Sequence, residues 1–538
     1  MSPDCDVSGG SRVTLSGLTG ALTESGALGV GVNSSGSGLI SVNGTWNESS
    51  GELVLVTVGG GLRSGGVYEV WFVLRNGAVG QGSPGVSVRA SVRSADGPDE
   101  GLGYFEAMDK ASLSALGVAG GSAALLVHVP VLRVAWIEQS NPLASASNAV
   151  RVRLSADCDV RGGSVVSVVG LVGSLTVSAV SLPVYGNGSF VDGGVWNQSA
   201  GALVVSVGGG GLRAFEEYEL WFVLRNGGVE QASPDVSVAG MVESEWGAYG
   251  APVALAAMNK SGADAVGVTG GAAPLLVHVP GFSNRSIGQS IPFALSSNVI
   301  SVTLGFDCVI AAGSNVTLTG LTGAASGDDG ALVVSGGSSF RGTGSWVRGS
   351  GEGVFGVVSA VGQGETHVLR ITLRNGDAEQ GARSVNASVS VFSAWGVDAG
   401  LSGVVGMDEA TGDLLGVAGG SGALRVHVPG FWSASIGQSN PLASASNNVT
   451  VTLVPDCDMG SGSVVRVFGL TGALSADRND LAVASSGSFS VSAVWVSWNG
   501  SVALTVGSLG IKNGTSYVVS FVLRNGAVNQ SSPGVSVR

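Results

Sequence analysis

Charged side chains are scarce in this sequence of 538 residues, at 12% of the total, and positive ones are the scarcest. Lys and Arg together number 25 against 38 Asp and Glu, which gives a net charge of −13. A shortage of positive charge argues against nucleic acid and anionic lipid as partners. At 44% hydrophobic residues, the composition also differs from that of a disordered chain.

Long apolar runs are missing as well. Because the sequence has no stretch of 18 or more apolar residues, we expect no membrane insertion. Residues 1–10 lack the basic and apolar regions of a signal peptide. Leu, Lys and Glu are too sparse for long amphipathic helices, whereas Gly, with 90 positions, and Val are abundant.

Cysteine is rare, and every copy follows an aspartate at a regular interval: Cys5, Cys158, Cys308 and Cys457. The phrase Leu-Arg-Asn-Gly recurs in the same register, at residues 74–77, 224–227, 373–376 and 523–526. Val-His-Val-Pro recurs too, with His128, His278 and His427. These phrases return about every 150 residues, which is the signature of a tandem array. We predict four repeats: residues 1–130 without a first strand, 131–280, 281–430, and 431–538, incomplete at the C-terminus.

Both ends of the sequence fall inside a repeat. We therefore expect a segment of a longer chain, with the signal peptide outside it. The alternative is that a neighbouring subunit supplies the missing first strand, as donor strands do in fibres.

Apolar and polar residues alternate before each Asp-Cys. Val150, Val152 and Leu154 fall on one face, and Arg151 and Arg153 fall on the other. A period of two is typical of a half-buried β-strand. Asn-Gly favours a type I′ turn, so each Arg-Asn-Gly is expected to close a hairpin onto the strand that ends in Val-Ser-Val. Many short strands with frequent turns predict an all-β chain of tandem Ig-like antiparallel β-sandwich domains.

Sequons for N-glycosylation are the strongest functional signal, because 13 of the 23 asparagines stand in Asn-X-Ser/Thr, well above chance. Asn315 and Asn448 alternate with core residues, which places them on the solvent face. The sequons predict covalent N-glycans and a secretory route. The candidate sites are Asn33, Asn43, Asn47, Asn187, Asn197, Asn259, Asn284, Asn315, Asn386, Asn448, Asn499, Asn513 and Asn529.

The four cysteines offer two interpretations. One cysteine per repeat leaves no partner inside the same domain, and the alternation points each side chain into the core. We therefore expect Cys5, Cys158, Cys308 and Cys457 to be buried free thiols. Disulfides between chains of an assembly are the alternative.

No catalytic residue, cofactor or metal site is predicted. Each recurring histidine stands alone in an apolar strand, which indicates a structural role. The Asp-Cys-Asp triplets could contribute carboxylates to a calcium site between domains, although the third copy has Val309 in place of the second Asp. The Gly-rich runs are interpreted as turns.

Several phrases resemble a known group of proteins. They are Ser-Ile-Gly-Gln-Ser at 286–290 and 435–439, Asn-Val-Thr-Val-Thr-Leu at 448–453, Gly-Leu-Thr-Gly at 17–20, and Leu-Arg-Asn-Gly-Ala at 74–78. Together they resemble the very large, Gly/Ser/Val-rich tandem-repeat glycoproteins of microalgae and related protists. The resemblance covers nearly the whole chain, implies a secreted or cell-surface protein, and brings no active-site residues.

These observations predict a structural, non-enzymatic glycoprotein outside the cell, in which copies of the chain form a surface fibre, flagellar hair or wall layer. The alternative is a cell-surface adhesin or carbohydrate-binding module that uses the sandwich loops.

Overall fold

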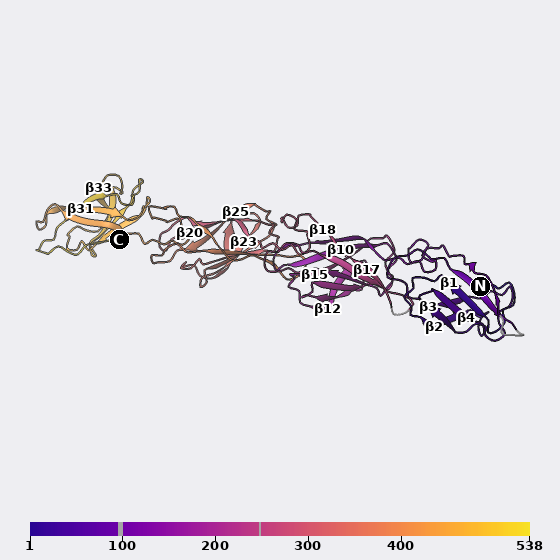
Figure 1. Cartoon of the computed structure of the whole chain (residues 1–538). Coiled ribbons are helices and arrows are strands. Elements are labelled where there is room, and N and C mark those ends of the chain that lie inside the picture. Colours follow the sequence, from indigo (N-terminus) through magenta and orange to yellow (C-terminus); the bar gives the residue numbers. More distant parts are fainter. Residues whose placement is uncertain (95–99, 247–248) are drawn as a thin grey trace. The chain divides into compact units, whose positions relative to one another are not determined.

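The computed structural model describes residues 1–94, 100–246 and 249–538, and these residues form an all-β protein (Figure 1). Within those ranges the chain has no helix, and so none that is long and apolar enough to cross a membrane. The chain divides into two compact units. The first consists of residues 1–265, 269–278 and 394–398, and the second of residues 266–268, 279–393 and 399–538.

The first unit contains two sheets. One has the strand order β5-β2-β3-β4-β1-β6-β7, with β8 also paired to β6. Its strands are β1 (Arg12–Ser16), β2 (Gly26–Val32), β3 (Asn43–Asn47), β4 (Glu52–Val56), β5 (Val70–Phe72), β6 (Ser87–Arg93), β7 (Glu100–Leu102) and β8 (Glu106–Ala107).

The other sheet of the first unit has the order β17-β16-β11-β14-β13-β12-β15-β10-β9-β18. Its strands are β9 (Leu132–Gln139), β10 (Ser147–Ala156), β11 (Val165–Val169), β12 (Ala179–Gly186), β13 (Gly193–Asn197), β14 (Ala202–Ser206), β15 (Tyr218–Arg225), β16 (Ser237–Val242), β17 (Ala251–Ala257) and β18 (Asn259–Lys260).

The second unit begins with a sheet of the same arrangement, β27-β26-β21-β24-β23-β22-β25-β20-β19-β29, with β28 also paired to β26. Its strands are β19 (Phe282–Gln289), β20 (Ser297–Phe306), β21 (Asn315–Thr319), β22 (Asp329–Ser335), β23 (Phe340–Val347), β24 (Glu352–Val357), β25 (Thr366–Arg374), β26 (Asn386–Val391), β27 (Gly400–Leu401), β28 (Val405–Gly406) and β29 (Asp408–Glu409).

The last sheet has the order β30-β31-β36-β33-β34-β35-β32-β37. Its strands are β30 (Phe431–Gln438), β31 (Ser446–Pro455), β32 (Val464–Phe468), β33 (Arg478–Ser485), β34 (Ser492–Val496), β35 (Ser501–Thr505), β36 (Tyr517–Arg524) and β37 (Ser536–Val537). Each of the four sheets thus lies inside one of the four segments predicted from the sequence.

One strand in each sheet divides it into two ladders. The first half of β12 pairs with β13, and its second half, from Val184 to Gly186, pairs with β15, after an irregularity between Ala179 and Leu182. The buried cluster of this sheet contains residues of both ladders, such as Phe222 of β15 and Leu203 of β14. The core therefore lies between the two ladders, as in sandwich- and barrel-like domains.

The predicted alternation is confirmed in the strands that precede the last three Asp-Cys pairs. Val150, Val152 and Leu154 of β10 are buried, whereas Arg151 and Arg153 are only half-buried. The same pattern holds for β20 and β31. These strands bury one complete face because each side of a pleated strand carries every second residue.

The hairpin predicted at Arg-Asn-Gly is wrong. The strand β15 ends at Arg225 and pairs with β10 and β12, whereas the Val-Ser-Val segment continues into β16, which pairs with β11 and β17. Neither Asn226 nor Gly227 has the positive φ that a type I′ turn requires. The segment instead crosses from one ladder to the other. Asn226 is fully buried, because its side chain is used in tertiary hydrogen bonds.

One tryptophan in each sheet is almost completely buried: Trp46, Trp196, Trp346 and Trp495. Each indole Nε1 donates to a backbone carbonyl, as Trp196 does to Thr176 at 2.9 Å. The hydrogen bond removes the cost of burying the indole N–H, so the ring can fill the centre of each core. These tryptophans recur at the spacing of the repeat. The sequence therefore contained a signal for these buried residues that the alternation of apolar and polar positions did not reveal.

Candidate functional site

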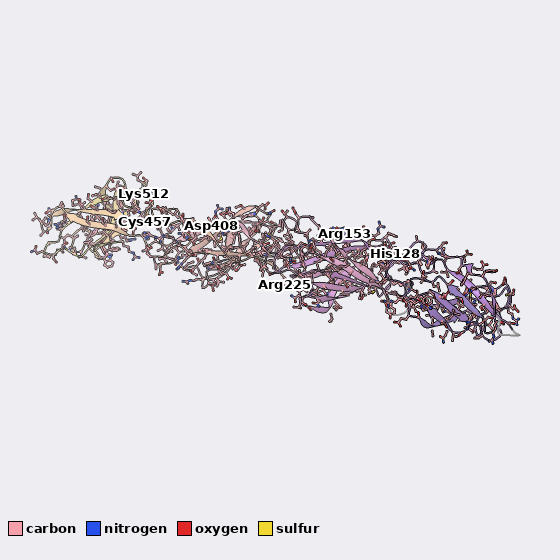
Figure 2. All side chains as sticks on the ribbon, in the orientation of Figure 1. His128, Arg153, Arg225, Asp408, Cys457 and Lys512 are labelled. Carbon is pink, nitrogen blue, oxygen red and sulfur yellow. The ribbon has the colours of Figure 1, made fainter. Side chains whose placement is uncertain are left out.

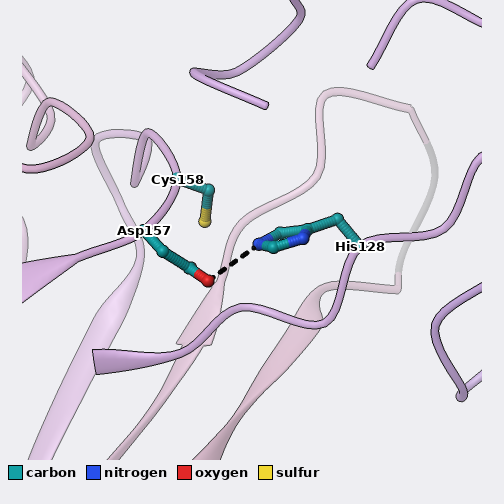
Figure 3. A group of neighbouring side chains, drawn as sticks. All are labelled: His128, Asp157 and Cys158. Carbon is teal, nitrogen blue, oxygen red and sulfur yellow. Dashed lines mark ion pairs between the residues drawn. The ribbon is translucent and has the colours of Figure 1, made fainter. Parts of the chain in front are cut away.

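The hairpin of β9 and β10 brings together two segments that are far apart in the sequence. Strand β9 begins two residues after the proline of Val-His-Val-Pro, and its first residue, Leu132, pairs with Ala156 at the end of β10. His128 therefore lies beside Asp157 and Cys158, with its Nε2 3.1 Å from Oδ2 of Asp157 (Figure 3). The sulfur of Cys158 points toward this pair, and the three possible ligand atoms lie within 4.8 Å of one another.

The second unit contains the same cluster. The strand β30 follows His427 and pairs antiparallel with β31, so that Asp456 and Cys457 return to the histidine. The Nε2 of His427 lies 3.3 Å from Oδ1 of Asp456, and all three ligand atoms again lie within 4.8 Å. The arrangement is thus built into the repeat.

The expectation that each histidine stands alone is wrong, because the antiparallel hairpin returns the chain to its starting point. The sequence did contain a signal for this arrangement. In three copies the histidine precedes the aspartate of Asp-Cys by the same 29 residues: His128 and Asp157, His278 and Asp307, His427 and Asp456. This spacing predicts a contact between the histidine and the aspartate only when it is known that the residues between them form one antiparallel hairpin.

Backbone amides fix the aspartate of each cluster. Oδ1 of Asp157 accepts the N–H of Val131 at 2.9 Å, and Oδ1 of Asp456 accepts the N–H of Gly430 at 2.7 Å. The carboxylate is therefore held beside the histidine by the first residues after Val-His-Val-Pro. Only modest side-chain freedom remains.

The second aspartate of each triplet has different partners. Oδ1 of Asp159 accepts the N–H of Ala214 at 2.8 Å, and Oδ2 of Asp458 lies 2.8 Å from Nζ of Lys512, near Cys457 (Figure 2). The hydrogen bonds to Lys512 and to the backbone lower the pKa of Asp458, although desolvation, the largest single effect, opposes them. Neither carboxylate belongs to the His–Asp–Cys cluster. The two acids of a triplet therefore have different partners, and a contribution of these carboxylates to a calcium site between domains stays a prediction.

A glutamate orients the histidine of the second unit. Nδ1 of His427 lies 2.9 Å from Oε1 of Glu379, which also accepts the N–H of Val428 at 2.7 Å. The corresponding Glu230 lies 3.2 Å from Nδ1 of His278 within the first unit. At the position that corresponds for His128, the sequence has Gly80. The clusters of His427 and His128 therefore differ in the residue at the position beside Nδ1 of the imidazole, which is Glu379 for His427 and Gly80 for His128.

A strained turn contacts the Asp-Cys-Asp segment. Leu116 has a φ of 49°, which is unfavourable for a large side chain, and its carbonyl accepts the N–H of Asp159 at 2.9 Å. Leu415 has a φ of 51°, and its carbonyl accepts the N–H of Asp458 at 2.8 Å. Gly117 follows with a φ of 71°, and a Cβ there would lie 2.5 Å from Cβ of Ala214. Strain of this kind persists only where the surrounding structure imposes it.

The cysteines agree with the sequence at three of four positions. Cys158, Cys308 and Cys457 are buried, whereas Cys5 is exposed, so the prediction of burial is wrong there. The first described strand, β1, begins at Arg12, so Cys5 does not follow a paired strand as Cys158 follows β10. All four are free in this structure.

Burial controls the chemistry of the covered thiols. It raises the pKa of Cys158 to about 11 and that of Cys308 to about 12, and the neighbouring aspartate adds to the effect in both cases. The pKa of Cys457 is raised to about 12 in the same way, mainly by burial and then by Asp456. A protonated, covered thiol is a poor nucleophile.

The sequon asparagines lie at the surface. Ten side chains are exposed, and three, Asn33, Asn386 and Asn499, are half-buried. Asn315 and Asn448 are exposed, as the alternation predicted. The exposed ones are Asn43, Asn47, Asn187, Asn197, Asn259, Asn284, Asn315, Asn448, Asn513 and Asn529. Whether any of them carries a glycan stays a prediction.

No family model matches the sequence, and no curated protein matches it either. Among solved structures, a crystal structure of dimeric latent PorU from Porphyromonas gingivalis is similar over 87% of this chain and 38% of that chain. The identity is 8% and the TM-score is 0.15. The alignment spans less than half of PorU, and a score this low carries no argument about fold or function.

Proposed function

We propose that this chain is a repeat segment of an extracellular structural glycoprotein that builds a surface fibre, flagellar hair or wall layer. Its repeats are Ig-like β-sandwich domains in this proposal. Copies of the chain are its principal partners, and N-glycans are attached to its surface. The recurring His–Asp–Cys segment, which joins the end of one repeat to the start of the next, carries the proposal.

That join is short and hydrogen-bonded. In the first unit, the carboxylate of Asp157 accepts the backbone N–H of Val131, directly after Val-His-Val-Pro, and the backbone N–H of Asp159 donates to the carbonyl of Leu116. The second unit repeats both contacts at Asp456 and Asp458. Ordered connections of this kind limit bending between domains, which suits a load-bearing array better than a flexible linker does.

The contacts of residues 394–398 also support the proposal of a repeat array. Residues 394–398 are remote in sequence but belong to the first unit. Trp395 packs edge-on against Trp221 with ring centroids 5.8 Å apart, and Trp221 stacks on Tyr185 at 4.0 Å. Nε of Arg225 lies 3.5 Å from Oδ1 of Asp398. These contacts place a segment from a later part of the sequence in the first unit.

The experiment is electron microscopy of the purified chain from a secretory expression host, together with its mass. We expect stiff rods or filaments with a regular axial repeat and a mass that exceeds that of the polypeptide by attached glycans. Flexible, bead-like monomers without glycan would contradict the proposal.

The competing proposal, a cell-surface adhesin or carbohydrate-binding module, draws on exposed tryptophans such as Trp498, which is 81% exposed. Exposed aromatic side chains often mark binding surfaces. Saturable binding on a glycan array that Trp498→Ala abolishes, with the fold intact, would favour this second function.

A further inference from the structure

The two His–Asp–Cys clusters combine three kinds of ligand atom: an imidazole nitrogen, a carboxylate oxygen and a sulfur. Zn²⁺ binds these atoms at about 2.0–2.3 Å, so that the ligands of a tetrahedral site lie roughly 3.3–3.8 Å apart. Separations of up to 4.8 Å therefore need only small side-chain movements to close on one ion. Calcium and magnesium, by contrast, prefer oxygen ligands alone.

The imidazole of His427 is oriented for ligation. Glu379 lies on its Nδ1 at 2.9 Å, which leaves Nε2 as the nitrogen that faces Asp456 and Cys457. Nε2 is buried and 3.3 Å from Oδ1 of Asp456, without the alignment of a hydrogen bond. That oxygen already accepts the N–H of Gly430 at 2.7 Å. A carboxylate behind a metal-binding histidine is the usual arrangement in zinc sites.

We propose that His427, Asp456 and Cys457 bind a thiophilic divalent cation of the Zn²⁺ class, and that His128, Asp157 and Cys158 bind the same class of ion more weakly. On binding, the sulfur of the cysteine loses its proton to solvent. The thiolate and the carboxylate then balance the two positive charges of the ion, and the imidazole stays neutral. Three protein ligands leave the fourth position to water.

The two sites differ in strength because of one residue. Glu379 fixes the ring of His427, whereas Gly80 at the corresponding position gives His128 no such support. Loss of an outer carboxylate of this kind weakens metal affinity by about 10–100-fold. The inference goes beyond the proposed function and does not depend on it.

The experiment uses the full chain, reduced and freed of metal, in a Cys308→Ser background so that the third Asp-Cys copy contributes nothing. Co²⁺ is titrated, and the near-ultraviolet charge-transfer band between thiolate and Co²⁺ is recorded, followed by competition with Zn²⁺. We expect the intensity of the band to rise in two phases as Co²⁺ is added. Cys457→Ser should remove the phase with the tighter binding, and Cys158→Ser should remove the phase with the weaker binding. Cys5→Ser is the matched control, because Cys5 has the same Asp neighbours and is exposed, and it should change nothing.

Two variants with opposite expected effects test the carboxylate beside Nδ1 of the histidine. Neither variant changes a proposed metal ligand. Glu379→Gln should weaken the tighter phase by about 10-fold or more. Gly80→Glu should strengthen the weaker phase, and a Cβ at Gly80 would meet its nearest atom at the ordinary contact distance of 3.5 Å. Circular dichroism of the metal-free variants checks that the fold is unchanged.

Two results would overturn the proposal. One is the absence of a thiolate band at saturating Co²⁺. The other is a band that survives Cys158→Ser and Cys457→Ser but disappears with Cys5→Ser, which would assign it to the exposed thiol.

Discussion

Asn148 donates a 2.9 Å hydrogen bond from Nδ2 to Oδ1 of Asn226, which lies 78 residues further along the chain, and both side chains are fully buried. Nδ2 of Asn226 in turn donates to the carbonyls of Asn141 and Leu143. The second unit contains the same bond twice, between Asn298 and Asn375 at 2.8 Å and between Asn447 and Asn525 at 2.9 Å. The asparagine of Leu-Arg-Asn-Gly thus joins the end of one strand to the start of its neighbour.

Replacing Asn226 by Ala should destabilise its sheet by about 3 kcal/mol, because the change removes one partner of the buried Asn148 amide and the side-chain hydrogen bonds to two backbone carbonyls. Hydrogen exchange of the full chain should show the loss in β10 and β15. Asn76→Ala is the matched control, since Asn76 occupies the same place in the motif but is exposed. Equal effects of the two changes would contradict the assigned role.

Alkylation under native, metal-free and reducing conditions should label Cys5 alone. Cys158, Cys308 and Cys457 are buried, and their pKa values of about 11 to 12 leave almost no thiolate at neutral pH. Peptide mass spectrometry should find them labelled only after unfolding. Mixed-chain disulfide peptides from the buried cysteines in unreduced native material would instead support bridges between chains.

Glycan occupancy should follow exposure. The ten exposed sequons should be modified more completely than Asn33, Asn386 and Asn499, whose side chains are half-buried and leave less room for a bulky glycan. Site-by-site glycopeptide mass spectrometry of secreted protein measures this. Replacing Ser or Thr of a single sequon by Ala serves as the control for each site. Full occupancy at the half-buried sites with none at the exposed ones would contradict the link between exposure and occupancy, whereas the absence of glycan at every sequon would count against the secretory interpretation.

Trp395→Ala should release residues 394–398 from the first unit. The aromatic pair with Trp221 contributes about 0.5–1.5 kcal/mol beyond its buried area, whereas the partly exposed Arg225–Asp398 pair contributes about 0–1 kcal/mol. We therefore expect Trp395→Ala to raise hydrogen exchange and proteolysis of this segment more than Asp398→Ala does. Trp498→Ala, an exposed tryptophan outside the first unit, is the control. The reverse order of effects would show that the ion pair holds the segment.

Local pattern was sufficient for the strands but not for their pairing. Alternation identified β10, β20 and β31 and the buried positions on them, because a pleated strand buries every second residue whatever it pairs with. The turn signal at Asn226-Gly227 failed, because a tertiary use of the side chain overrode the local preference of Asn-Gly. Local residue patterns do not indicate which strands pair when the paired residues are 78 positions apart.

The sequence by itself determined the all-β class and the period of the repeat, since these depend on residue type and spacing alone, and it correctly predicted the burial of the last three cysteines. Only the tertiary structure decided that His128 meets Asp157 and Cys158, because the return of an antiparallel hairpin joins positions 29 residues apart. It also decided that Cys5 is exposed, because burial of a side chain needs a neighbouring strand as well as an inward direction.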